Sequence, residues 1–277
     1  MDCEQVLKNL IKGTCDYLQS HDIKCMVLGI SGGIDSTVAA YICHQVSLQT
    51  GIPLIGRSLP SSTNKSDENI AAQTVGEVFC DDFKIVDINN IYTTTLSGFT
   101  EKEMLDMTLI AKGNIKARIR MNYLYNIACV KHGIVIDTDN LTEHYLGFWT
   151  LHGDEGDLDV LGDLWKTDVY ELAKYIIKNE PNVKIKSALN HSINLTPTDG
   201  NGVSSSDLEQ FGVPAYDIAD EILKKLVANN GIYPRLEGDL MPNEYVQNIS
   251  KRYQASMFKR EHRPFDVKQT GIVTAKQ

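Results

Sequence analysis

Apolar positions fall into two alternating patterns over the first half of the chain. Short apolar runs bounded by turn residues predict a buried strand at 24–30 and further strands at 52–60, 83–88 and 133–138. Apolar residues at helical spacing fill the stretches between them, at 6–18, 36–48, 61–79 and 114–131. Strands that alternate with helices indicate an α/β fold, with a doubly wound, Rossmann-like parallel sheet and helices on both faces.

The second half of the chain has a different pattern. We expect the strands to stop at about residue 139, and helices to form at 163–178, 215–229 and 243–259. The segment 194–207 is rich in Gly, Pro, Ser, Thr, Asn and Asp, which predicts a long loop that could act as a flap. We therefore expect one domain over 1–277, with a parallel-sheet core at about 20–140 and a helical, loop-rich part at about 141–277.

Composition and charge narrow the function classes. A formal net charge of -9 argues against a broad nucleic-acid surface, since nucleic-acid binding uses Lys and Arg to neutralise phosphates. No apolar run approaches the roughly 20 residues that cross a bilayer, so no membrane contact is expected. The six cysteines form no CxxC pair, which disfavours a zinc ribbon or a redox motif. These features predict a cytoplasmic protein with free thiols.

The stretch VLGISGGIDSTVAA, Val27 to Ala40, carries the first candidate chemistry. Adjacent glycines between a strand and a helix let the backbone approach an anion at the positive end of the helix. Asp35 could hold a metal against phosphates, and Ser31 adds a hydroxyl. A plain βα turn, with Ser31 and Ser36 acting only as caps, is the alternative reading. Neither GxxxxGK[ST] nor GxGxxG is present, which disfavours Walker-type NTPases and dinucleotide-dependent dehydrogenases.

SGGIDS resembles the pyrophosphate loop of the ATP pyrophosphatase superfamily, which cleaves ATP between its α and β phosphates. The stretches GNIKARIRMNYLYNIA, DTDNLTEHYLGFWTLHGDEGD and LGDLWKTDVYELAKY extend the likeness. Together they resemble ammonia-dependent NAD synthetase over about 24–265. This resemblance implies an adenine nucleotide alpha hydrolase-like sheet, a homodimer, and Mg2+ as cofactor.

The resemblance also implies a set of site residues. Catalytic roles fall to Lys166 and Asp154, and Asp35 and Glu143 would hold Mg2+. The matching ATP contacts are Gly29, Ile30, Ser31, Gly32, Gly33, Ile34, Asp35, Ser36, Thr138, Lys166 and Thr198. The matching deamido-NAD contacts are Arg118, Asp157 (with Asp159 as the fallback), Lys259 and Arg260.

Helical spacing gives a separate expectation for the basic residues of 114–131. Lys116 and Arg120 are four apart and share a helix face, whereas Arg118 points elsewhere, so only part of this triplet can face one anion.

The implied reaction is the ATP-dependent amidation of deamido-NAD by ammonia, which yields NAD, AMP and pyrophosphate through an acyl-adenylate. Ammonia is the expected nitrogen donor, because 277 residues leave no room for a glutaminase domain. Two alternatives remain open: another amidating or thiolating enzyme with this type of loop, and a non-catalytic nucleotide-binding relative.

Several positions depart from the family pattern: Asp137, Leu151, Leu208, Gln210 and Phe258. Asp137 stands where the family has a glycine, beside the expected triphosphate. We expect its side chain either to turn outward to solvent or to attract additional Mg2+, since a carboxylate next to a phosphate is otherwise unfavourable.

Overall fold

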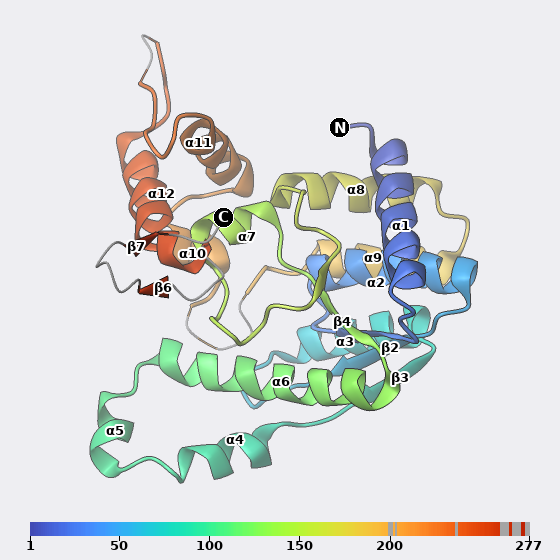
Figure 1. Ribbon diagram of the computed structural model, residues 1–277. Coiled ribbons are helices and arrows are strands. Elements are labelled where there is room, and N and C mark those ends of the chain that lie inside the picture. The colour runs from blue at the N-terminus through green and yellow to red at the C-terminus, as the bar shows by residue number, and fades with distance from the viewer. Residues whose placement is uncertain (199–201, 203, 236–237, 261–265, 268–272, 275–277) are drawn as a thin grey trace.

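A parallel sheet forms the centre of the protein (Figure 1). The computed structural model describes residues 1–198, 202, 204–235, 238–260, 266–267 and 273–274. Its strands lie in the order β3-β2-β1-β4-β5, and all of them run parallel. They are β1 (Met26–Gly29), β2 (Leu54–Ser58), β3 (Asp82–Ile85), β4 (Ile134–Asp137) and β5 (Leu158–Asp159). The strand order reverses between β1 and β4, where sheets of this class bind ligands.

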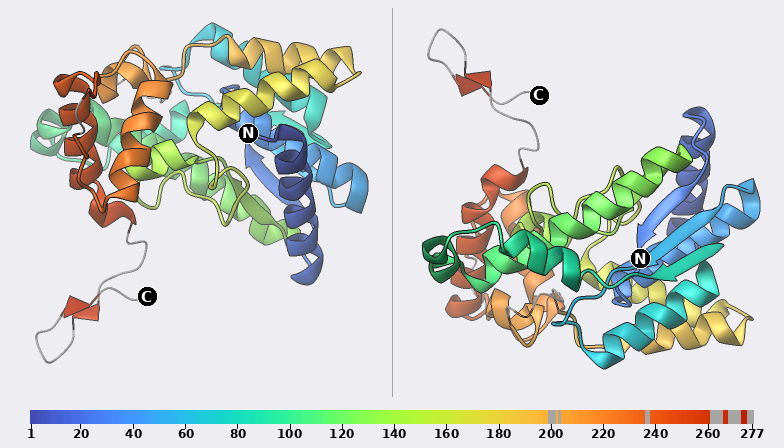
Figure 2. Two further views of the ribbon diagram at one scale, coloured as in Figure 1. Left: turned by 90° about the horizontal axis from the view of Figure 1, so that it is seen from above. Right: turned by 90° about the horizontal axis from the view of Figure 1, so that it is seen from below.

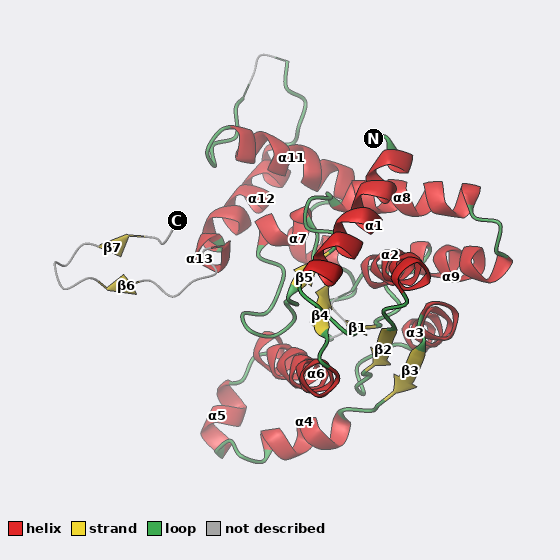
Figure 3. Cartoon of the chain, turned by 45° about the vertical axis from the view of Figure 1, so that its right-hand side comes forward, coloured by secondary structure: helices red, strands yellow, loops and turns green. Residues whose placement is uncertain are grey.

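Helices cover both faces of the sheet, as expected for a doubly wound fold (Figure 3). Met26 and Leu28 of β1 face one layer, and Val27 faces the other, because strand side chains alternate. The first layer contains α1 (Cys3–Ser20), α2 (Ile34–Thr50), α3 (Ser66–Phe79), α8 (Lys166–Asn179) and α9 (Val183–Ile193). The second contains α6 (Leu109–Lys131), which packs on β1 and β4.

A helical region with its own apolar core lies beside the sheet (Figure 2). It contains α7 (Leu141–Leu146), α10 (Asp207–Phe211), α11 (Tyr216–Ala228), α12 (Asn243–Ala255) and α13 (Met257–Arg260). Two short helices, α4 (Asn89–Leu96) and α5 (Glu101–Asp106), connect β3 to α6. No helix among the described residues is long and apolar enough to span a membrane.

The expectation that strands stop at about residue 139 is wrong. β5 pairs in parallel with β4, and β6 (Asp266–Val267) pairs antiparallel with β7 (Val273–Thr274). β5, β6 and β7 have two residues each, which is too short to produce an alternating pattern in the sequence. The helix α6 also begins five residues before the predicted position, because the Thr108 side chain accepts a hydrogen bond from the Ala111 N–H and caps it.

Candidate functional site

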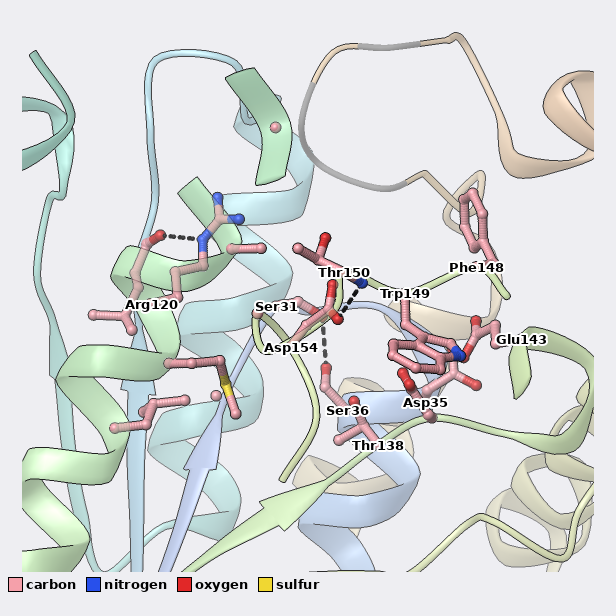
Figure 4. Close-up of a pocket in the computed structure, with 18 of the residues that line it drawn as sticks. Ser31, Asp35, Ser36, Arg120, Thr138, Glu143, Phe148, Trp149, Thr150 and Asp154 are labelled. Carbon is pink, nitrogen blue, oxygen red and sulfur yellow. Dashed lines mark hydrogen bonds between the residues drawn. The ribbon is translucent and has the colours of Figure 1, made fainter. Parts of the chain in front are cut away.

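A cavity of about 440 Å3 opens at the carboxyl ends of β1, β2 and β4 (Figure 4). Its walls come from the turn after β1, the segment after β2, the inner face of α6 and the segment between α7 and β5. Among its lining residues are Gly29, Ile30, Ser31, Asp35, Ser36, Arg120, Thr138, Glu143, Phe148, Trp149, Asp154, Arg252 and Lys259. Its position matches the rule that open parallel sheets bind ligands beyond their carboxyl edge.

The glycine turn at the base of this cavity is held by its own hydroxyl groups. Gly32 has φ +85°, and Gly33 is the N-cap of α2. The Ser31 Oγ accepts a hydrogen bond from the Gly33 N–H at 3.2 Å and lies 2.9 Å from the Ser36 Oγ. Ser36 in turn donates to the Gly33 carbonyl at 3.1 Å. The first N–H groups of α2 therefore end beside the cavity, as an anion site requires.

Lys166, Asp35 and Glu143 form an ion cluster next to the turn, and we call it the Lys166 cluster. Lys166 begins α8, and only 2% of its side chain is exposed. Its Nζ donates to the Asp35 carboxylate and, at 2.9 Å, to the Glu143 carboxylate. Burial opposes the charged ammonium, but the two carboxylates outweigh it and raise the pKa of Lys166 well above its usual value. The ammonium is therefore charged at neutral pH.

Asn140 fixes both carboxylates of the Lys166 cluster. Its Nδ2 donates to the Asp35 Oδ1 at 2.9 Å, and its Oδ1 accepts from the Glu143 N–H at 3.1 Å. The Glu143 Oε2 accepts from the Asn140 N–H at 3.3 Å, which completes a capping box at the start of α7. The first turn of α7 and the first turn of α2 are thereby joined.

The Lys166 cluster offers two carboxylates to a cation. Among the described residues, no group of three or more His, Cys, Asp or Glu side chains could hold a metal ion alone. Mg2+ commonly binds through one or two carboxylates together with substrate phosphates. Asp35 and Glu143 both line the cavity and lie on either side of one ammonium, so they fit an ion that arrives with phosphate oxygens.

The Asp137 side chain does not turn outward to solvent, so that expectation is wrong, and both of its carboxylate oxygens accept hydrogen bonds from backbone N–H groups. Asp137 is 8% exposed. Its Oδ1 accepts from the N–H groups of Thr138 at 2.6 Å and Asp139 at 3.0 Å, and its Oδ2 accepts from the Gly156 N–H at 2.9 Å. The carboxylate thus holds together the two loops that follow β4 and precede β5. Asp139 lies on this ordered loop and lines the cavity.

The buried carboxylate of Asp220 is linked to the Lys166 cluster through Thr142 and Thr167. Asp220 of α11 is 1% exposed, and its Oδ2 accepts from the Thr167 N–H at 3.0 Å and from the Thr167 hydroxyl at 2.7 Å. Its Oδ1 accepts from the Thr142 hydroxyl at 2.5 Å, and the Thr142 Oγ1 accepts from the Lys166 N–H at 2.8 Å. Asp220 therefore fixes the starts of α7 and α8 relative to each other.

Asp220→Asn should lower the free energy of unfolding by about 1–3 kcal/mol, because an amide cannot accept at both positions. Burial raises the pKa of Asp220 despite its three donors. A carboxyl with a raised folded-state pKa contributes stability that is lost as pH rises above its ordinary value, so the deficit of the variant should shrink from pH 5 to pH 8. Urea unfolding of both proteins at pH 5 and at pH 8 measures this difference in the free energy of unfolding. Asp217→Asn, at an exposed position of α11, is the control, and a deficit that grows with pH would contradict the assignment.

The model of the NAD synthase family matches residues 6–263 of this chain. The chain belongs to the NAD synthase family. It is 32% identical to an NH(3)-dependent NAD(+) synthetase of Helicobacter pylori, a match that covers 92% of this chain and 94% of the relative. It is 30% identical to the protein of the same name from Methanococcoides burtonii, with 94% of each covered.

Two solved structures of similar fold cover 94% of this chain and 96% of their own. The structure of NMN synthetase from Francisella tularensis has a TM-score of 0.76 and 27% sequence identity. The NH3-dependent NAD synthetase from Campylobacter jejuni, in complex with the nitrate ion, has a TM-score of 0.71 and 24% identity. The second likeness therefore concerns the fold alone.

Six of the residues that the family resemblance gave to ATP line the cavity: Gly29, Ile30, Ser31, Asp35, Ser36 and Thr138. Gly32, Gly33 and Ile34 shape the turn beneath it, and Lys166 lies under the cavity floor through its bonds to Asp35 and Glu143. Thr198 is not a lining residue, but its hydroxyl donates to Glu68 Oε1 at 2.8 Å, and Glu68 does line the cavity. Residues 199–201 and 203 of the predicted flap lie outside the described residues.

The residues that the resemblance gave to the pyridine nucleotide separate into two groups. Lys259 lines the cavity, where its Nζ donates to the carbonyls of Gly147 and Trp149. Arg118, Asp157 and Arg260 do not line it. Arg118 donates to the Leu151 carbonyl at 3.1 Å, Asp157 accepts from the Tyr125 hydroxyl at 3.0 Å, and Arg260 donates to the Tyr145 carbonyl at 2.8 Å.

Asp154 lies in the cavity wall, and its Oδ1 accepts from the Thr150 N–H at 2.6 Å. Asp159, the fallback for Asp157, lines a neighbouring cavity that shares Asp139 and Trp149 with the first.

Helical spacing predicted correctly which basic residues of α6 share a face of the helix. Lys116 is buried and donates to the Thr63 hydroxyl at 2.8 Å, and Arg120 lines the cavity and donates to the Leu59 carbonyl at 3.0 Å. Arg118 is exposed on a different face. Sequence reasoning missed Arg252 and the aromatic wall of Phe148 and Trp149, because nothing in their local pattern distinguishes them from ordinary helix and loop residues.

Proposed function

We propose that this chain is an ammonia-dependent NAD synthetase, which uses ATP to convert deamido-NAD and ammonia into NAD, AMP and pyrophosphate. The observation that carries the proposal is the Lys166 cluster, which lies beside a glycine turn at the carboxyl edge of the sheet. The family match over 6–263 supports the same activity. A buried ammonium next to an anion-binding turn suits a reaction in which pyrophosphate departs.

The glycine turn would hold the phosphates of ATP through the α2 N–H groups and the Ser31 and Ser36 hydroxyls. The nicotinate carboxylate would attack the α-phosphorus, and Lys166 would stabilise the negative charge of the departing pyrophosphate. Ammonia would then displace AMP from the acyl-adenylate. Mg2+, held by Asp35, Glu143 and the phosphates, would neutralise phosphate charge when bound. The wall that carries Thr138 and Asp154 would exclude water from the acyl-adenylate.

The test is turnover of purified protein with ATP, deamido-NAD and ammonium, with the nicotinate carboxylate labelled by oxygen-18. We expect NAD, pyrophosphate, and AMP that carries one labelled oxygen. If ADP and phosphate appear instead, the proposed chemistry is wrong. Nicotinate mononucleotide should be tested in parallel, because the Francisella tularensis neighbour is an NMN synthetase. A higher kcat/KM with nicotinate mononucleotide would identify it as the preferred substrate, and the proposed type of reaction would remain the same.

Glutamine should not replace ammonium as the nitrogen donor. A glutaminase of the cysteine type needs an accessible thiol activated by a neighbouring base. Burial raises the pKa of five of the six cysteines: Cys3, Cys15, Cys25, Cys43 and Cys80. The sixth, Cys129, is exposed and forms no hydrogen bond to a described histidine or carboxylate. Assays with ammonia-free glutamine should therefore give no NAD formation above background. A rate with glutamine comparable to the rate with ammonium would contradict this prediction.

The proposal includes a single synthetase domain over 1–277, a homodimer and a cytoplasmic location. Leu105, Leu109 and Ile110 are 86%, 58% and 59% exposed on α5 and α6, and a second copy could bury them. All six cysteines are free thiols, which suits a reducing compartment. Light scattering of the purified protein should give twice the chain mass, and a stable monomer at micromolar concentration would exclude the dimer.

A further inference from the structure

Arg252, near the end of α12, is a charged side chain of the cavity wall that the proposed reaction does not use. Its Nε donates to the Leu146 carbonyl at 3.2 Å, and its Nη1 donates to the Gln210 carbonyl at 3.4 Å. The guanidinium carbon lies 5.1 Å from the ring centres of both Phe148 and Phe211. These four contacts fix the guanidinium in one orientation at the cavity.

The guanidinium has more donors than this environment uses. An arginine side chain carries five N–H bonds, and two of those of Arg252 are satisfied by carbonyls. No described residue accepts a hydrogen bond from its Nη2, and no described carboxylate forms an ion pair with it. Two aromatic rings stabilise the charge but accept no conventional hydrogen bond. A half-buried cation with donors left over at a cavity is best satisfied by an oxyanion of a ligand.

A second cation lies in the same wall. Lys259 lines the cavity, and its Nζ is held by the carbonyls of Gly147 and Trp149. The Leu146 carbonyl accepts a hydrogen bond from Arg252, and Leu146 directly precedes Gly147. Both cations are therefore anchored on the turn that ends α7. Burial lowers the pKa of Arg252 and of Lys259, and the nearby carboxylates of Asp207 and Asp154 oppose this only in part.

We infer that Arg252 binds an oxyanion of the pyridine nucleotide substrate through its Nη1 and Nη2 donors. The inference rests on the proposed function. ATP phosphates have their own site at the glycine turn and the Lys166 cluster, so the anionic groups that remain are the nicotinate carboxylate and the phosphates of the pyridine nucleotide. Both present two oxygens that match the fork of a guanidinium. Arg252 is thus a binding residue for the second substrate, on a different wall of the cavity from the turn that would hold ATP.

Calorimetric titration of deamido-NAD, NAD and ATP into the full chain tests the inference. The variants are Arg252→Met, which keeps apolar packing against Phe148 and Phe211, and Arg252→Lys, which keeps the charge without the fork. Lys251→Gln, at the exposed neighbouring position of α12, is the control. We expect Arg252→Met to weaken deamido-NAD binding roughly 10- to 100-fold, and Arg252→Lys to weaken it less. ATP affinity should change by less than about 2-fold in every variant.

The two anionic groups are separated by the NAD titration. NAD carries the same phosphates as deamido-NAD but an amide in place of the carboxylate. If Arg252→Met loses affinity for deamido-NAD alone, Arg252 binds the carboxylate. If it loses equal affinity for deamido-NAD and NAD, Arg252 binds a phosphate. Either result supports the inference. Unchanged deamido-NAD affinity in Arg252→Met would overturn it, and so would a parallel loss of ATP affinity, which would make Arg252 a structural residue. Failure of the wild-type chain to bind any pyridine nucleotide would instead refute the proposed function.

Discussion

Lys166→Met should lower the rate of acyl-adenylate formation by about 100-fold or more, with a smaller effect on deamido-NAD affinity. The Lys166 ammonium lies between Asp35 and Glu143 beside the glycine turn, where negative charge would develop on the departing pyrophosphate. A charge that acts mainly in the transition state changes kcat more than substrate binding. Rapid-quench measurement of pyrophosphate release gives the rate directly. An unchanged kcat would show that Lys166 has no part in the reaction.

The same substitution should also destabilise the protein. Methionine leaves the Asp35 and Glu143 carboxylates without their counterion, and breaking a buried pair typically costs about 3–5 kcal/mol. The rate must therefore be measured below the melting temperature, with the folded fraction determined by circular dichroism. Lys174→Met is the matched control, since Lys174 is an exposed lysine two turns later in α8. It should change neither the rate nor the stability appreciably.

Gly32→Ala should abolish tight ATP binding and lower the free energy of unfolding by about 3 kcal/mol or more. Gly32 has φ +85°, where a side chain is strained. An added Cβ would also lie 2.6 Å from the Ala72 N and 2.7 Å from the Glu68 O, which are backbone atoms of α3. Either α3 or the turn must move, and a displaced turn loses the hydroxyl and N–H geometry at the start of α2. Urea unfolding and ATP calorimetry measure the two effects.

Gly51→Ala is the control that separates backbone strain from steric contact. Gly51 ends α2 at φ +73°, and a Cβ there would meet nothing within 4 Å. It should cost about 1 kcal/mol through strain alone and leave ATP binding intact. If Gly32→Ala and Gly51→Ala had equal effects on stability, close packing of the turn against α3 would play no part.

The sheet and its main helices could be predicted because their signals are local. β1 and β4 are short apolar runs, β2 begins as one, and β3 alternates Phe83 and Ile85 with polar residues. The helices α1 and α8 have an apolar period that their packing preserves. β5 could not be predicted, because two residues define no pattern and Leu158 and Asp159 pair only after β4 is in place. The short helix α7 was not predicted, although the capping box of Asn140 and Glu143 at its start is a recognisable signal in the sequence.

The candidate site was predictable only in part. The glycine turn has a local signature, but Lys166 lies 131 positions after Asp35, and family resemblance rather than spacing linked them. Asp137 was misjudged because the partners of its carboxylate are backbone N–H groups, including that of Gly156, which no side-chain pattern reveals. Arg252 escaped notice because an arginine in an amphipathic helix is ordinarily a solvated residue.

The cavity wall also has a consequence for how the protein is made. Its lining begins at Leu28 and ends at Lys259, so the first and last parts of the described fold meet in one site. A ribosome must therefore release nearly the whole chain before the wall is complete. The sheet through β4 can pair earlier, since its strands lie within the first 137 residues. A nascent chain would then expose the glycine turn while it still lacks α12, so the wall that carries Arg252 would be the last part of the site to form.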